Sequence, residues 1–255
     1  MTSETLIWSE RLLGFSVLLQ SIELLLVRKS FSENGIWSWT NLRNDYPFFF
    51  KTLFTPVFSC WGFVGVLILQ AVFAALLMAL PNETWTVVLL VFLTTLLVSW
   101  RFRGTYNGGS DFMTMVVLIG LTGARIFPQW EKYFIAYIAV QVCLSYFVSG
   151  LVKLKKKSWI TGEALQSLSK SSNYSIPARA RDFMSRSSIA RIGGFLLLVF
   201  EISFPLALIN ADFCRVYLVI AVIFHLAMVY VFGLNRFLWA WLSAYPALLY
   251  WINRG

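Results

Sequence analysis

Long apolar runs separated by short polar gaps dominate this chain of 255 residues. Most runs have the length that a helix needs to cross the hydrocarbon core of a bilayer, roughly 20 residues. The pattern therefore predicts an all-α integral membrane protein, built as a bundle of about eight transmembrane helices. The predicted spans are residues 6–27, 57–80, 85–100, 112–127, 132–154, 190–210, 214–233 and 237–252.

Composition indicates the same class of protein. Hydrophobic residues make up 58% of the chain and charged residues only 13%, and the mean hydropathy is +0.71. These values are far from those of soluble globular domains. Since the spans and their connections use most of the chain, we expect a single transmembrane domain over residues 1–255. The first apolar run is followed by no small-residue cleavage site, so we expect it to be retained.

The net charge is +9. In a soluble protein this charge would indicate nucleic acid as a partner, but in a membrane protein it does not. Here the Lys and Arg residues lie in the gaps between apolar runs, where they act as topology signals and contact lipid headgroups. We therefore expect membrane lipids as partners and no nucleic acid. The distribution of charge places the connections after the first, third, fifth and seventh spans in the cytoplasm.

The fifth predicted span ends at Lys153, and Lys155, Lys156 and Lys157 follow it directly. One interpretation is that these lysines anchor a helix end at the lipid headgroups. The other is specific to Lys153, which lies at the boundary between the apolar run and water. Burial there favours the neutral form of a lysine, and a neutral lysine can act as a base.

Several polar residues lie inside the predicted spans, where an unsatisfied polar group costs several kcal/mol. Such residues are normally kept for a functional site or for a contact within the bundle. The single histidine of the chain, His225, fits either role, and a metal site would need companion ligands that the sequence lacks, so no metal is predicted. The polar residues concerned are Glu10, Arg11, Glu23, Gln141, Glu201 and His225.

A glycine pair follows Asn107 in the connection before the fourth predicted span. Gly108 and Gly109 allow backbone amides to approach a ligand closely, and Ser110 or Asp111 would cap a helix starting at Phe112. The alternative interpretation is an ordinary loop that leads into a helix.

Three blocks of the chain together resemble one family. The run Tyr146-Phe-Val-Ser-Gly150 with Lys153, Trp159 and Gly162 is similar to the Tyr-x-x-[Ala/Ser]-Gly-x-x-Lys…Trp-x-x-Gly signature of the vitamin K-dependent gamma-carboxylases and their bacterial relatives, the HTTM (horizontally transferred transmembrane) domain proteins. The Asn107–Asp111 loop and the Phe200–Pro205 block followed by Phe224-His225 agree in order and spacing. The resemblance covers most of the chain.

This resemblance implies a site. Lys153 would be the base that deprotonates a reduced, vitamin K-like quinone, and His225 would share its pocket. His225 and Asn107 would orient the quinol or a reacting intermediate, so that Lys153 and His225 are the catalytic residues. Asn107, Gly108 and Gly109 would bind the cofactor. The resemblance adds Tyr146, Trp159, Gln141 and Glu201 as further cofactor-binding residues of that pocket.

For function, the resemblance implies a quinol- and oxygen-coupled enzyme of a bacterial inner or cell membrane that modifies a peptide or lipid. The alternative is a non-catalytic membrane partner in the maturation or export of a secreted peptide or toxin. A small-molecule transporter is the weakest reading, because the chain shows no internal repeat. Asn107-Gly108-Gly109 stands where the carboxylases have Asn-Asn-His, so we do not expect this chain alone to carboxylate glutamate.

Overall fold

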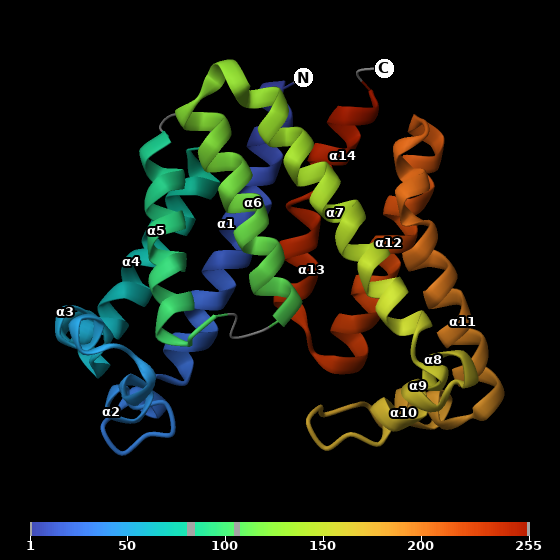
Figure 1. Cartoon of the computed structure of the whole chain (residues 1–255), viewed down its shortest axis with the longest axis horizontal. Coiled ribbons are helices and arrows are strands. Elements are labelled where there is room, and N and C mark those ends of the chain that lie inside the picture. The colour runs from blue at the N-terminus through green and yellow to red at the C-terminus, as the bar shows by residue number, and fades with distance from the viewer. Residues whose placement is uncertain (1, 81–84, 105–107, 254–255) are drawn as a thin grey trace. The chain divides into compact units, whose positions relative to one another are not determined.

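The computed structural model describes residues 2–80, 85–104 and 108–253, and within them every regular element is a helix (Figure 1). This confirms the all-α class. The described residues pack as two compact units. Unit 1 contains those of residues 1–134 together with Trp239–Ser243, and unit 2 contains Ile135–Leu238 and those that follow from Ala244. The single domain over residues 1–255 stays a prediction.

Unit 1 is a four-helix bundle in which each helix packs against two others. Helix α1 packs against α4 and α6, and α5 packs against the same two helices, so the four close into a ring whose neighbouring helices run antiparallel (Figure 1). Two short helices, α2 (Trp39–Leu42) and α3 (Phe48–Phe58), connect α1 to α4. The bundle helices are α1 (Thr2–Leu26), α4 (Cys60–Ala79), α5 (Trp85–Arg101) and α6 (Gly108–Ile126).

Polar side chains inside this bundle are paired with one another. The carboxylate of Glu10 is fully buried and lies 2.6 Å from Nε of Arg125. Gln20 donates a hydrogen bond of 3.2 Å to the carboxylate of Asp111. Helix α6 begins before Phe112, the start expected from the sequence. Asp111 is therefore a buried residue within that helix rather than its cap. Polar residues of these spans are thus used for contacts within the bundle.

Arg101, at the end of α5, is also buried. Its guanidinium lies over the rings of Phe31 and Phe63, 4.9 and 4.3 Å from their centroids. It also donates hydrogen bonds to the backbone carbonyls of Trp37 and Phe58. The charge pattern suggests that Arg101 is an exposed residue of a connection between spans. In the structure, aromatic faces and backbone carbonyls surround its guanidinium in place of water molecules.

Unit 2 is built on α7 from Ile135 onward and on α11, α12 and α14. Asn210 caps the start of α12 by accepting a hydrogen bond from the amide of Phe213, and Gly233 ends that helix with a φ of 70°. Three short helices gather at one end of α11 (Figure 1). The main helices are α7 (Glu131–Leu154), α11 (Ser187–Ser203), α12 (Ala211–Phe232) and α14 (Tyr245–Ile252), and the short ones are α8 (Lys157–Thr161), α9 (Glu163–Ser169) and α10 (Ala178–Ser185).

Five helical segments of the described residues are long and apolar enough to cross a membrane, so the count of about eight is not confirmed. Helix α5 has only 17 residues, and α1 is interrupted by polar residues. The span expected over 237–252 is instead two eight-residue helices, α13 (Asn235–Leu242) and α14, which are separated by Ser243 and Ala244. The five segments are Cys60–Ala79, Gly108–Ile126, Pro128–Leu154, Ser187–Leu208 and Ala211–Phe232.

Candidate functional site

One face of α7 carries the residues of the candidate site. Tyr146, Ser149 and Lys153 follow one another at intervals of three and four residues, so their side chains project from the same side of the helix. Gly150 lies on this face and allows α11 to approach closely, because a Cβ atom there would lie 2.7 Å from Cγ1 of Ile202. The sequence motif therefore places a tyrosine, a serine and a lysine directly against α11.

Lys153 forms a partly buried ion pair with Glu201 of α11. Its Nζ atom lies 2.6 and 2.7 Å from the two carboxylate oxygens and also donates a hydrogen bond to Oγ of Ser149. The Ser149 hydroxyl donates in turn to Oε1 of Glu201 over 3.2 Å, and the ring of Trp159 lies 5.3 Å from Nζ. Only 18% of the lysine side chain and 4% of the glutamate side chain are exposed.

This geometry separates Lys153 from the lysines that follow it. Lys155, Lys156 and Lys157 are exposed, as residues that anchor a helix end in headgroups would be, whereas the ammonium group of Lys153 is turned into the protein. In this geometry Nζ of Lys153 donates hydrogen bonds to three oxygen atoms, whereas a base must accept a proton. The pair gains a neutral amine only when the proton on Nζ passes to Glu201.

A second network, which is buried, lies on the same face of α7, about two helical turns before Lys153. The hydroxyl of Tyr146 lies 2.7 Å from Nε2 of His225 on α12 and 2.8 Å from the hydroxyl of Tyr245 on α14. All three side chains are buried. The ring of Tyr146 stacks on Phe204 at a centroid distance of 4.0 Å, and Phe200 meets it edge to face. Two tyrosine hydroxyls and one imidazole thus share hydrogen bonds inside an aromatic shell.

The two networks are close neighbours within unit 2. Tyr146 and Lys153 are seven residues apart on one helix face, which corresponds to a rise of about 10 Å. Glu201 and Phe200, which serve the two networks, are consecutive residues of α11. The structure therefore brings together five of the residues that the sequence proposed for the site: Tyr146, Lys153, Trp159, Glu201 and His225.

The other proposed site residues do not join this group. Gln141 precedes Tyr146 by five residues, which turns it about 140° around α7 and onto another face. Gly108 and Gly109 form the exposed first turn of α6 in unit 1. Asn107 lies outside the described residues.

Sequence reasoning missed two members of the networks, Ser149 and Tyr245. Ser149 lies one helical turn before Lys153, and that spacing was a usable signal. Tyr245 is 99 residues from Tyr146 in the chain, and no local pattern connects them.

Comparison with known families gives one match, in which the model of the HTTM domain covers residues 121–251, just over half of the chain. All five of the clustered residues fall within this range. No curated protein and no solved structure matches the chain.

Proposed function

Because the chain belongs to the HTTM domain family, a family of transmembrane domains, we propose that it is a multi-pass membrane enzyme that moves protons during a quinol- and oxygen-coupled modification of a peptide or lipid. One observation supports this proposal above all. Two networks of ionisable side chains meet on one face of α7. All of their members except Tyr245 lie in segments that are apolar enough to span a membrane. Burying such groups in hydrocarbon is costly, and proteins usually retain them where they function.

The Lys153–Glu201 pair is the proton acceptor of this proposal. Within the pair, Lys153 is the group that takes the proton from the substrate, and both side chains are protonated after the transfer. Lys153 takes the proton itself only from the state in which it has already passed its own to Glu201, so that a neutral amine stands beside a neutral acid. Ser149 holds both side chains in place through its two hydrogen bonds.

The Tyr146–His225–Tyr245 network orients the substrate and passes protons between hydroxyl and imidazole groups. A reduced quinone is an aromatic ring with hydroxyl groups, and the chemistry of the residues present suits it. The rings of Phe200 and Phe204 pack on Tyr146, and a quinol would extend this aromatic cluster, with its hydroxyl groups held by the polar ends of Tyr146 and Lys153. Such a quinol, when bound, supplies the electrons that reduce oxygen.

Replacement of Lys153 by arginine tests the proton role, because arginine keeps the ion pair but does not lose its proton. We expect K153R to accumulate in the membrane like the wild type and to lose the modified product. Mass spectrometry of peptides and lipids co-expressed with each variant measures this loss. K155R is the matched control, since it makes the same change at an exposed lysine two residues away and should keep full activity. Product formation by K153R at the wild-type level would contradict the role of Lys153.

A non-catalytic role in the maturation or export of a secreted peptide is the second candidate, and the ion pair itself favours it. The ammonium group of Lys153 already donates to three oxygen atoms, so the pair is sufficient as a clamp between α7 and α11. In that case K153R and H225A would both support maturation fully. Substitutions at exposed residues of the surface segment 155–189 would instead disrupt a complex with the partner, which affinity purification of the tagged full-length chain would detect.

A further inference from the structure

Two adjoining hollows lie on unit 2, where the end of α8 meets the beginning of α11. They share Thr161, Arg191 and Ile192 as lining residues, so the two hollows lie next to one another. The first has a volume of about 340 Å³ and the second about 510 Å³. Both volumes fall in the range of small-molecule sites in proteins. Ser187 and Ser188 complete the first hollow, and Ile160, Phe195 and Leu196 complete the second.

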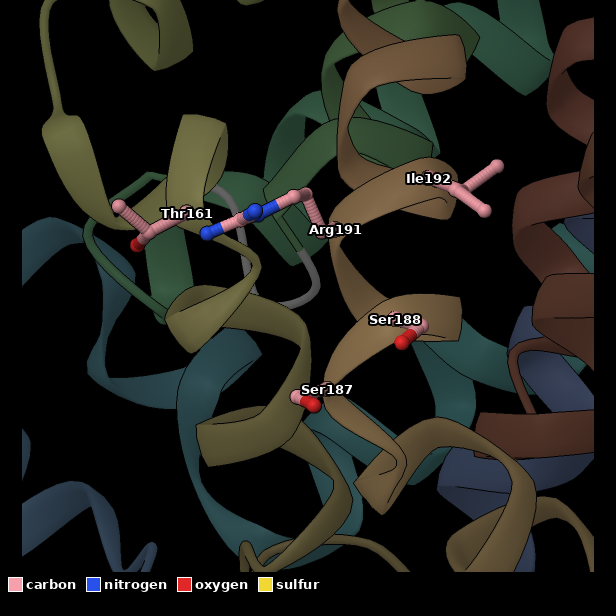
Figure 2. Close-up of a pocket in the computed structure, with 5 residues that line it drawn as sticks. All are labelled: Thr161, Ser187, Ser188, Arg191 and Ile192. Carbon is pink, nitrogen blue, oxygen red and sulfur yellow. The ribbon is translucent and has the colours of Figure 1, made fainter.

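The first hollow has the chemistry of an anion site. Arg191 extends from α11 toward Thr161, and the hydroxyl groups of Ser187 and Ser188 lie on the preceding turn of α11 (Figure 2). None of the five residues that line this hollow is acidic. A guanidinium group with nearby hydroxyls provides the donors that a phosphate group binds.

The second hollow is apolar and leads away from the charge. Phe195 and Leu196 are both 59% exposed, and Ile192 is 60% exposed. They lie on α11, and Phe195 and Leu196 follow Arg191 by four and five residues, a rise of about 6 to 8 Å. Because the apolar segment of α11 begins at Ser187, this direction leads from the membrane boundary into the hydrocarbon. A polar end at the boundary and an apolar end below it match one phospholipid molecule.

We propose that the two adjoining hollows together bind one anionic phospholipid, with its phosphate at Arg191 and one acyl chain along Ile160, Phe195 and Leu196. The charge of the surrounding segment favours an anionic lipid over a zwitterionic one. Residues 155–191 contain two acidic residues, Glu163 and Asp182, and a much larger number of basic residues. The basic residues are Lys155, Lys156, Lys157, Lys170, Arg179, Arg181, Arg186 and Arg191.

Two glycines hold the walls of this site in place. A Cβ atom on Gly194 would lie 2.5 Å from the carbonyl oxygen of Trp159, so the backbones of α8 and α11 touch there. Gly162 has a φ of 86°, and a Cβ atom on it would lie 2.5 Å from the amide nitrogen of Arg191. Thr161 directly precedes this contact. The polar hollow is therefore formed by two packed helices before any lipid binds.

Native mass spectrometry of the purified full-length chain tests the proposal. Phosphatidylglycerol and phosphatidylcholine with identical acyl chains are added separately to the wild type, R191Q and R179Q. We expect the wild type to bind phosphatidylglycerol in preference, and R191Q to bind it about tenfold more weakly, because one charge-assisted contact is lost. Arg179 is an exposed arginine of the same basic segment that does not line the hollow, so R179Q should bind as the wild type does.

A second pair of measurements separates a lipid from a free phosphate. F195A should weaken the binding of long-chain phosphatidylglycerol and leave that of a short-chain form unchanged. Inorganic phosphate should displace the lipid poorly. Equal losses in R191Q and R179Q would overturn the proposal, because general charge attraction would then explain the binding. Displacement of the lipid by inorganic phosphate at matched concentration would overturn it as well. Circular dichroism of R191Q, together with R191K as a charge-preserving variant, separates lost binding from lost folding.

Discussion

Replacement of Lys153 by methionine should destabilise the protein strongly, because it leaves the carboxylate of Glu201 buried without its cation. The glutamate side chain is 4% exposed, and Lys153 supplies two of its hydrogen bonds. Removing one member of a buried pair typically costs about 3 to 5 kcal/mol. Since 18% of the lysine side chain reaches solvent, we expect the lower end, about 3 kcal/mol. This corresponds to a change of roughly 150-fold in the folding equilibrium.

A double-mutant cycle separates the pair from the packing around it. E201M alone leaves an unpaired ammonium group and should cost less, because the longer lysine side chain can reach water. K153M/E201M replaces both charges by apolar side chains of similar length and should lie within about 1 kcal/mol of the wild type. The coupling between the two sites should therefore be about 2 kcal/mol or more.

Equilibrium unfolding in mixed micelles, followed by circular dichroism, measures these free energies. K155M is the control, because Lys155 is exposed and its replacement should change stability by less than about 0.5 kcal/mol. If the two single substitutions add in the double variant, the pair contributes no specific coupling. A K153M variant as stable as K155M would show that Glu201 is not held in a buried ion pair.

Two further substitutions test packing and hydrogen bonding in unit 2 by the same unfolding measurement. Y146F removes the hydroxyl bonded to His225 and Tyr245 and should cost about 1 to 3 kcal/mol, whereas no change in stability would show that this network is dispensable. G194A places a Cβ atom 2.5 Å from a carbonyl oxygen of α8 and should cost about 1 to 3 kcal/mol. G193A, which meets only a flexible leucine end at 3.3 Å, should not lose stability, and equal effects of the two would refute the close approach.

The strongest apolar runs were located well from the sequence. Residues 57–80 and 214–233 were expected as spans, and the structure has helices at Cys60–Ala79 and Ala211–Phe232. Hydropathy succeeds there because lipid exposure requires an unbroken apolar helix. Hydropathy did not locate the helices correctly at 237–252, because an average over a window of residues does not detect a break between two helices. The local signal was Pro246, which lacks an amide hydrogen and favours the first turn of a new helix.

The candidate site was predictable only along α7. Helical spacing places Tyr146 and Lys153 on one face from sequence alone. Their partners come from other helices, and the ion pair with Glu201 joins residues 48 positions apart. The sequence named Glu201 as a polar residue in a span but could not show that it neutralises Lys153. Whether a carboxylate lies beside Lys153 therefore could not be judged before the structure.

The division of the last helices between the two units has a consequence for biosynthesis. Trp239 belongs to unit 1, where its ring meets Phe15 at a centroid distance of 4.5 Å, and Tyr245 completes the hydrogen-bond network of unit 2. Neither unit is therefore complete until residues 239–245 have left the ribosome. A truncation before Trp239 would remove part of both units at once, so the synthesis of this short segment determines when each unit can finish folding.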